Sequence, residues 1–194
     1  MTADERPVSE PTGLRRLFSR MRQQSSSPPA AMPDVKPDLL ERLSPAALKT
    51  LSFAQEEART LGHRHIGTEH LLLALTRDPE FAAYKLLEQM GAVSATVRDQ
   101  VVQVLVTGPE AEPGALTLTP RARLALELAH RASTRIGVPQ TGTEHLLIGL
   151  AAESEGIGAR TLGKSGISAK AAEHRVTTNL DGKNALGPED VRKG

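Results

Sequence analysis

The sequence predicts an all-α protein built from two tandem four-helix repeats, eight helices in a pseudo-twofold arrangement, with a disordered tail at each end. Three observations predict this fold. A six-residue box occurs twice, apolar residues between the tails recur at helical spacing, and prolines gather near the N-terminus. Self-similarity at a fixed distance indicates one supersecondary unit that is used more than once.

The duplicated box is GTEHLL, which covers residues 67–72 and returns as residues 142–147, 75 positions later. A chance match of six residues would not keep its register in both directions. We expect the repeats at residues 38–106 and 118–180, joined by a linker at 107–117. The same offset aligns Leu43 with Leu118, Pro45 with Pro120, Leu51 with Leu126, Gly62 with Gly137 and Gly91 with Gly166.

The first helix of each repeat is expected to follow a hydroxyl residue and a proline, at 44–45 and at 119–120. A hydroxyl N-cap accepts a backbone N–H, and proline suits the first helical position because it has no N–H to leave unpaired. Gly62 and Gly137 are placed to end these helices in the left-handed conformation.

The second helix of each repeat is expected to start at Thr68 or Thr143, with a glutamate in its first turn, where the helix dipole favours an anion. The third helix is expected roughly over 80–90. The fourth carries valines at helical spacing over 93–104, and its copy from Ile167 onward is more polar. No segment shows the alternation of a half-buried strand.

Both ends of the chain are expected to be disordered. Residues 1–37 contain six of the 13 prolines and a run of three serines, so they cannot bury enough apolar surface to fold. Within them, residues 14–22 place apolar side chains at helical spacing among four arginines. This segment is either a basic amphipathic helix that touches an acidic partner or a membrane, or a solvated tail, which its short length favours. Residues 181–194 are expected to be flexible.

The composition excludes several classes of protein. The 194 residues contain no cysteine, which excludes disulfides, thiolate metal sites and a cysteine nucleophile. A formal net charge of +1 argues against a nucleic-acid binder. No apolar run approaches the ~20 residues of a membrane span, and no N-terminal apolar stretch marks export. A cytoplasmic location is therefore expected.

Residues 158–165 (GARTLGKS) satisfy the P-loop pattern, in which backbone N–H groups and a lysine, here Lys164, hold phosphates. The context opposes a nucleotide site. A P-loop follows a buried strand and opens a helix, but residues 151–156 are polar and Gly166 follows at once. Because the repeat also aligns this segment with a helix of the first copy, we do not expect a nucleotide-hydrolysing enzyme.

His63, His65 and His70 lie within eight residues, a spacing that suggests a metal site. Only His70 recurs, as His145, and Val138 stands at the position of His63. No carboxylate or thiolate cluster completes a metal shell, and no nucleophile and base occur at a catalytic spacing. The sequence therefore predicts no metal, no cofactor and no catalytic residue.

The helix starts offer a more specific candidate site. Ser44 and Thr119 begin helices whose free N–H groups can bind an anion, and Glu69 and Glu144 offer carboxylates at neighbouring helix starts. An anion site beside a carboxylate suits a ligand with both phosphate and guanidinium, because a carboxylate binds guanidinium through two hydrogen bonds. The alternative is plain capping, worth about 1 kcal/mol for each helix.

The boxes and their surroundings resemble the Clp N-terminal domain, the double repeat at the front of bacterial Clp unfoldases of the ClpC and ClpA type. The resemblance is carried by residues 55–63 (QEEARTLGH), 66–72 (IGTEHLL), 118–123 (LTPRAR) and 141–145 (TGTEH), and it covers about residues 40–178. It implies an eight-helix pseudo-twofold domain that binds adaptors, substrates or degrons for a Clp protease machine.

The resemblance also implies a ligand. ClpC-type domains bind phosphoarginine degrons with the glutamate of each GTEH box and the hydroxyl-capped start of the first helix. Carried over to this sequence, the binding residues are Glu69 with Ser44 and Glu144 with Thr119.

A second surface is implied at the seam between the repeats, where ClpC-type domains receive adaptor proteins and cyclic-peptide antibiotics. Where the family often has phenylalanine before the first helix of each repeat, this sequence has leucine. The alternative is an ordinary amphipathic helix face with solvated charges. The residues at this surface are Leu40, Leu118, Arg121, Arg123 and Glu127.

The sequence therefore predicts a non-enzymatic, stand-alone Clp N-domain protein that binds peptides, degrons or adaptors and so modulates Clp-dependent proteolysis. Clp unfoldases continue into two ATPase modules, which do not follow here. Two versions stay open: a partner of a Clp unfoldase or adaptor, and a decoy that sequesters ClpC-directed cyclic-peptide antibiotics and gives tolerance to them. A P-loop enzyme and a purely structural remnant are the less favoured hypotheses.

Overall fold

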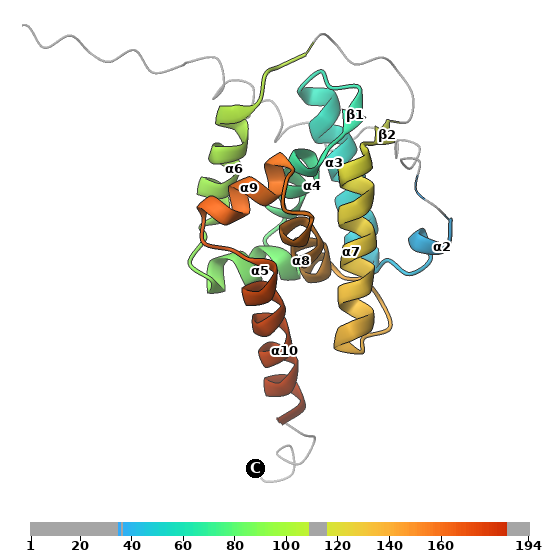
Figure 1. Cartoon of the computed structure of the whole chain (residues 1–194), viewed down its shortest axis with the longest axis vertical. Coiled ribbons are helices and arrows are strands. Elements are labelled where there is room, and N and C mark those ends of the chain that lie inside the picture. The colour runs from blue at the N-terminus through green and yellow to red at the C-terminus, as the bar shows by residue number, and fades with distance from the viewer. Residues whose placement is uncertain (1–34, 36, 109–115, 186–194) are drawn as a thin grey trace, which may run out of the picture. The chain divides into compact units, whose positions relative to one another are not determined.

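The structure is a computed structural model that describes residue 35, residues 37–108 and residues 116–185. The predicted basic segment at 14–22 and the last part of the predicted C-terminal tail lie outside the described residues. The mainly helical fold is confirmed (Figure 1). In chain order the elements are α2 (Pro37–Leu40), α3 (Pro45–Thr60), β1 (His65–Ile66), α4 (Thr68–Leu75), α5 (Ala82–Gln89), α6 (Ser94–Val104), β2 (Thr117–Leu118), α7 (Pro120–Ile136), α8 (Thr143–Glu153), α9 (Ile157–Lys164) and α10 (Ala169–Ala185).

Local sequence explains where the long first helix of each repeat begins and ends. At the start of α3, the side-chain oxygen of Ser44 accepts the N–H of Ala47 at 3.2 Å. At the start of α7, Thr119 accepts the N–H of Ala122 at 3.2 Å. A glycine with a φ of 70° or 85° follows each helix, a conformation that glycine adopts more readily than other residues.

Three details differ from the sequence prediction. The short helix α2 is additional, and Val35, which was expected in a disordered tail, is buried. Helix α10 continues to Ala185, past the expected boundary at residue 180, and no proline in this stretch interrupts it. The third difference is a pair of two-residue strands.

The strands β1 and β2 run parallel, with Ile66 opposite Leu118, and an isolated bridge joins Leu43 to Thr141 in the same sense. Strands of two residues show no alternation that a sequence could reveal. Each bridge joins the segment before a first helix to the segment before the GTEH box of the other repeat. The two repeats therefore exchange backbone hydrogen bonds at both of these places.

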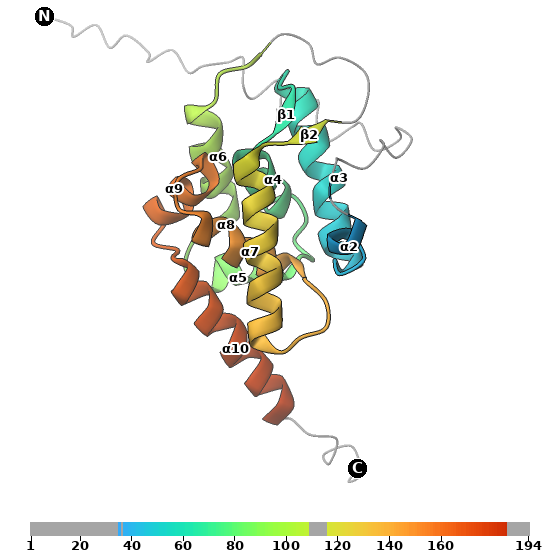
Figure 2. The ribbon, with the colours of Figure 1, turned by 45° about the vertical axis from the view of Figure 1, so that its right-hand side comes forward.

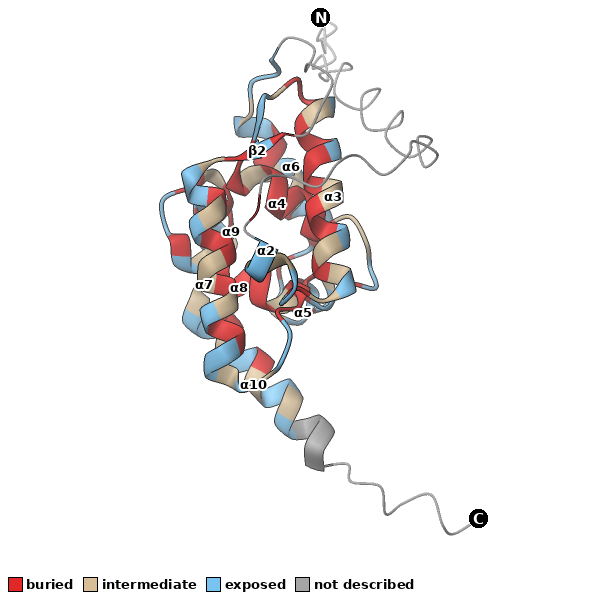
Figure 3. Cartoon of the chain, turned by 90° about the vertical axis from the view of Figure 1, so that its right-hand side faces the viewer, coloured by how far each residue is buried: buried red, intermediate tan, exposed pale blue. Residues whose placement is uncertain are grey.

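Of the described helices, the two GTEHLL helices, α4 and α8, have the largest share of buried residues (Figure 3). Apart from Glu69, every residue of α4 is buried, which is typical of a helix that is apolar on all sides. Helix α8 contacts helices of both repeats, and α7 lies along it (Figure 2). At Gly149 the two helices are so close that a Cβ would overlap the carbonyl oxygen of Ala125.

The threonines of the boxes cap helices in the opposite repeat. The side-chain oxygen of Thr68 accepts the N–H of Gly158 at the start of α9, at 3.2 Å. In the same way, Thr143 accepts the N–H of Ala83 at the start of α5, at 3.1 Å. Both threonines are buried, so each hydroxyl stabilises a helix start that water does not reach. These reciprocal bonds link the two repeats through their most similar residues.

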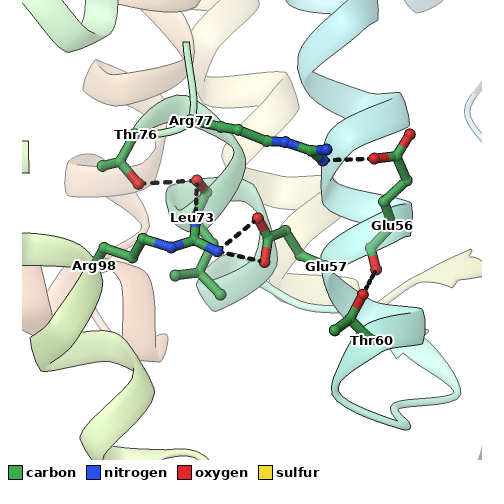
Figure 4. A network of polar contacts seen from close by, with 7 residues as sticks. All are labelled: Glu56, Glu57, Thr60, Leu73, Thr76, Arg77 and Arg98. Carbon is green, nitrogen blue, oxygen red and sulfur yellow. Dashed lines mark hydrogen bonds and ion pairs between the residues drawn. The ribbon is translucent and has the colours of Figure 1, made fainter. Parts of the chain in front are cut away.

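A buried ion pair links three helices of the first repeat (Figure 4). One nitrogen of the Arg98 guanidinium on α6 lies 2.9 Å from both carboxylate oxygens of Glu57 on α3, and another donates to the carbonyl of Leu73 on α4 at 3.2 Å. Burial raises the pKa of Glu57, and the positive charge of Arg98 opposes this rise.

Among the described residues, no helix has both the length and the apolar character needed to cross a bilayer.

Candidate functional site

Each residue of the GTEH box has its own position at a helix start. Gly67 is the N-cap of α4 and donates its N–H to Nδ1 of His70 at 2.8 Å, and the equivalent bond in the second box is 3.0 Å. The histidine thus takes the place that glutamate or glutamine has in the common capping box. The glutamates keep the most exposure within the box, with 17% of the Glu69 side chain and 25% of the Glu144 side chain exposed.

Glycine at the N-cap allows each glutamate to fold back over its own helix start. A Cβ at Gly67 would overlap the carboxylate of Glu69, and a Cβ at Gly142 would overlap that of Glu144. The first turn of a helix favours a negative charge, so each carboxylate lies where the helix dipole attracts it.

The structure corrects the pairing of hydroxyl and carboxylate that was carried over from the resemblance. Ser44 precedes α3 and Glu69 comes after its far end, and a helix of 16 residues spans roughly 24 Å. The same holds for Thr119 and Glu144 at the two ends of α7. The hydroxyl and the glutamate of one repeat therefore cannot contact one ligand group together.

Backbone hydrogen bonds pair the residues across the repeats instead. Thr119 donates its N–H to the carbonyl of Ile66 at 2.9 Å, directly before the first box. Ser44 donates its N–H to the carbonyl of Thr141 at 3.0 Å, directly before the second box. We call the first meeting point site 1, formed by Thr119 and Glu69, and the second site 2, formed by Ser44 and Glu144.

Each site offers fewer backbone donors than the sequence suggested. Proline occupies the first helical position, and the hydroxyl oxygen already accepts the N–H of the third residue. The N–H of the second residue, Ala46 or Arg121, has no acceptor within its helix. The hydroxyl of Ser44 or Thr119 can still donate its own hydrogen. An anion at either site would therefore meet one O–H and one N–H, with a carboxylate at the adjacent helix start.

The first box contains a chain of hydrogen bonds through two histidines. His70 accepts the N–H of Gly67 at Nδ1, so its hydrogen is at Nε2, which lies 2.8 Å from Nδ1 of His63. Nε2 of His63 in turn lies 2.8 Å from the carbonyl of Val106. Burial, with His63 adding to the effect, lowers the pKa of His70 to about 3. Each of the four ring nitrogens therefore has a hydrogen-bond partner.

This pattern bears on the metal prediction. His63, Glu69 and His70 place potential ligand atoms within 4.8 Å of one another, a carboxylate-containing cluster that the sequence did not reveal. A metal ion would need a lone pair on His70, but Nδ1 is used by the N–H of Gly67 and Nε2 carries the hydrogen. The hydrogen bonds favour a structural role for the cluster.

The second box lacks this chain, because Val138 replaces the second histidine. Nε2 of His145 is buried and has no hydrogen-bond partner among the described residues. His145 accepts the N–H of Gly142 at Nδ1 as His70 accepts that of Gly67. The two boxes therefore share their capping geometry, but only the histidine of the first box has a hydrogen-bond partner at Nε2 among the described residues.

The second predicted surface changes in composition. Leu118, expected as an apolar contact for partners, is only 5% exposed and belongs to the core, because strand β2 turns its side chain inward. Leu40, Arg123 and Glu127 are half-buried. Leu124 is 41% exposed and was not predicted. The surface that was expected to receive cyclic peptides thus has less apolar area before α7 than the resemblance implied.

Arg121 is engaged within the second repeat. Its guanidinium donates to Glu153 at 2.7 Å and also to Glu155. Glu153 is buried and accepts the N–H of Gly156 at 2.7 Å, so it caps the entry to α9. The sequence interpretation missed Glu153, because no sequence pattern near it indicates that its side chain caps the following helix. Arg121 is exposed but held in place beside Thr119.

The P-loop pattern forms a helix. Residues 158–164 lie within α9, and Lys164 is its last residue rather than part of a loop around phosphate. Gly158 is required by packing, since a Cβ there would come 2.7 Å from the carbonyl oxygen of Thr68. The packing therefore explains Gly158, whereas a Cβ at Gly163 would meet no atom within 4 Å.

The protein is an all-α double-repeat domain. Each repeat caps a helix of the other, and short strands pair between them. Within that class the chain belongs to the Clp repeat (R) N-terminal domain family, which matches residues 42–165 and 117–189.

Similar proteins support this assignment. The chain is 40% identical over 146 residues to the "negative regulator of genetic competence ClpC/MecB" of Bacillus subtilis strain 168, which covers 75% of this chain and 18% of that protein. It is 35% identical over 153 residues to the chaperone protein ClpB of Oceanobacillus iheyensis, which covers 79% of this chain and 19% of that protein. The chain thus spans less than a fifth of the length of these relatives.

Solved structures show the same fold. The N-domain of ClpV from Vibrio cholerae superposes with a TM-score of 0.66 at 14% identity, over 82% of this chain and 97% of that one. The N-terminal domain of ClpD from Arabidopsis thaliana gives a TM-score of 0.54 at 23% identity, over 73% and 96%. A ClpV N-domain in complex with a VipB peptide gives 0.52 at 16% identity, over 77% and 98%.

Proposed function

We propose that this protein is a non-catalytic binding module that recognises phosphoarginine on other proteins and so modulates Clp-dependent proteolysis. The observation that carries the proposal is the crossed arrangement of sites 1 and 2. In each site a donor-bearing helix start meets a glutamate from the other repeat.

The chemistry of the two halves of phosphoarginine matches the two halves of each site. A carboxylate such as that of Glu69 can accept two parallel hydrogen bonds from a guanidinium group. The hydroxyl of Thr119 and the N–H of Arg121 can donate to phosphate oxygens at a helix start, where the dipole favours an anion. A ligand that carries only one of the two groups would use half of the site.

The relatives support a binding role. The Bacillus subtilis relative, which is 40% identical to this chain over 146 residues, is named a regulator. A ClpV N-domain of the same fold has been solved with a bound peptide. Modules of this fold therefore include one that holds a peptide segment of another protein, and we extend that kind of activity to this chain.

Calorimetric titration of the full chain with free phosphoarginine tests the proposal. We expect binding to the native protein and a loss of at least about tenfold in affinity in the double variant Glu69→Gln, Glu144→Gln. Hydrogen bonds to charged groups are worth about 1.5–3 kcal/mol, and about 1.4 kcal/mol is tenfold. The matched control Glu127→Gln removes a carboxylate from α7 and should bind normally. Absence of binding to the native chain, or equal binding by the double variant, would refute the proposal.

A charge introduced beside the phosphate tests the crossed pairing itself. Thr119→Asp keeps a capping oxygen but places a negative charge where phosphate would bind, and Thr119→Asn is the neutral control. In a Glu144→Gln background, which leaves site 1, we expect Thr119→Asp to abolish binding. In a Glu69→Gln background, which leaves site 2, it should have no effect. The opposite result would restore the pairing within each repeat.

A further inference from the structure

A groove of about 490 Å³ lies between the end of α5 and the first two turns of α10. Figure 1 shows these two helices meeting, with α5 in green and α10 in dark red. The length of α5 separates the groove from Thr143 at the start of the second box. We call it the α10 groove. Its lining residues are Met90, Ser168, Lys170, Ala171, His174 and Arg175.

The first repeat contains a smaller copy of this groove, of about 170 Å³, at the start of α6. We call it the α6 groove. The fold builds both grooves in the same way, from the turn after the third helix and the start of the fourth, closed by the end of the third helix of the other repeat. At the 75-residue offset, Val93 maps onto Ser168, Thr96 onto Ala171, Gln100 onto Arg175, and Ser165 onto Met90.

The two copies share a backbone but differ in charge. Arg175 stands where the α6 groove has Gln100, and Lys170 stands where α6 has Ala95. His174 replaces an aspartate, Asp99. The α6 groove has the same backbone but no charged lining residue. The fold therefore does not require the basic residues of the α10 groove, and they need a separate explanation.

The cationic groups of the α10 groove are not matched by a carboxylate of the groove. Glu173 on the same helix is turned toward α7, where the guanidinium of Arg135 holds both of its oxygens at 2.6 Å. Among the described residues, no ion pair involves the side chain of Lys170 or Arg175. Met90 and Ala171 provide an apolar contact between these charges.

We propose that the α10 groove binds an acidic peptide segment of a partner protein. Its aspartate or glutamate side chains pair with Lys170 and Arg175, and an apolar side chain of the peptide packs on Met90. Complementary charge sets the orientation of such a segment, and the apolar contact adds affinity. This surface is separate from sites 1 and 2 and serves a different chemical class of ligand.

A nucleic acid fits the groove less well than a peptide. Proteins that bind single strands combine a basic track along the backbone with aromatic rings on which bases stack. Here the charges are confined to the first two turns of one helix, and His174 is the one ring in the lining, which contains no Phe, Tyr or Trp. The formal net charge of +1 gives no general attraction to a polyanion.

Fluorescence anisotropy of a labelled peptide titrated with the full chain tests the proposal. The probe is a ten-residue peptide with aspartates and glutamates around a central leucine, and its control has asparagine and glutamine in their place. We expect the acidic peptide to bind and the double variant Lys170→Gln, Arg175→Gln to lose roughly tenfold in affinity and much of the salt dependence. The matched control Arg160→Gln, Lys164→Gln removes the same charge from α9 and should bind as the native chain does.

A second variant tests the apolar contact, and the remaining outcomes overturn the proposal. Met90→Ser introduces the residue of the α6 groove and should weaken the leucine peptide but not a glycine analogue. Equal loss in the α9 control, no loss in the α10 variant, or preferential binding of single-stranded DNA would each refute an acidic-peptide site. Peptide binding that disappears in Glu69→Gln, Glu144→Gln would assign it to sites 1 and 2 instead. Peptide binding that is retained in Glu69→Gln, Glu144→Gln would support the α10 groove whether or not phosphoarginine binds to sites 1 and 2.

Discussion

At the scale of single residues, His70 makes the stability of the protein depend on pH. Its pKa is lowered from 6.5 to about 3 in the folded state, so the unfolded chain binds an additional proton between these values. The Glu69 carboxylate, 3.4 Å from Nδ1, would favour a charged ring, but Nδ1 already accepts a hydrogen bond and burial prevails. The stabilising contribution is complete above about pH 6.5 and is lost as the pH falls toward 3.

We therefore expect the free energy of unfolding, measured by urea denaturation and circular dichroism, to fall between pH 7 and pH 4.5. Each pKa unit corresponds to about 1.4 kcal/mol. The variant His70→Gln should flatten this dependence, because glutamine can cap the helix at the same position but does not titrate. His65→Gln, which changes an exposed ring, is the control and should leave the slope intact. An unchanged slope in His70→Gln would show that other groups cause the acid sensitivity.

The residues of the candidate site were predictable one by one but not as pairs. Ser44 and Thr119 could be recognised as caps because a cap depends on residues within one turn. Which GTEH box lies beside each cap depends on how the two repeats pack, and no local pattern contains that information. The burial of Leu118 was missed for the same reason, since only the pairing of β2 with β1 turns this leucine into the core.

At the scale of elements, an ion pair joins the first and fourth helices in both repeats, with its polarity reversed. In the first repeat α3 supplies Glu57 and α6 supplies Arg98, whereas in the second α7 supplies Arg135 and α10 supplies Glu173. The first pair is largely buried and the second is largely exposed. The same contact between helices should therefore contribute very differently to stability in the two repeats.

We expect Arg98→Met to lower the free energy of unfolding by about 3–5 kcal/mol, because it leaves the buried Glu57 without a partner. The loss should grow as the pH rises, since burial raises the pKa of Glu57 and folding then opposes its ionisation. Adding Glu57→Leu should recover most of the stability. Urea denaturation measures all of these changes.

The exposed pair provides the matched control for this experiment. Arg135→Met should cost between 0 and about 1 kcal/mol, as is usual for surface pairs. A cost in Arg98→Met no larger than that of Arg135→Met would show that Glu57 becomes hydrated or protonated without penalty. It would then follow that the network in Figure 4 contributes little to the stability of the fold.

The elements themselves followed from the sequence wherever their signals are local. The starts of α3 and α7 agree with the hydroxyl-proline pairs, and both helices end before glycines in the left-handed region. The short strands did not follow, because two residues carry no periodicity. The continuation of α10 was missed because Gly182 and charged residues resemble a tail, although nothing in that stretch prevents a helix.

At the scale of the whole molecule, the two repeats are joined more closely than their separate sequences suggest. Thr68 caps α9, Thr143 caps α5, and the segments before the boxes pair with the other repeat. A mutation in one box therefore acts directly on a helix of the other repeat. Sites 1 and 2 are formed at these junctions, so neither site exists in an isolated repeat.

The crossed caps predict that α4 and α8 unfold as one cooperative unit, although they belong to different repeats. We expect native-state hydrogen exchange to give both helices the same free energy of opening. Thr68→Val, which removes the cap from Gly158 and keeps the shape of the side chain, should lower that value by about 1–2 kcal/mol in both helices together. Thr178→Val, on the exposed face of α10, makes the same chemical change and should lower neither. If Thr68→Val accelerated exchange in α9 alone, the repeats would be separate folding units, and sites shared between them would open with each repeat independently.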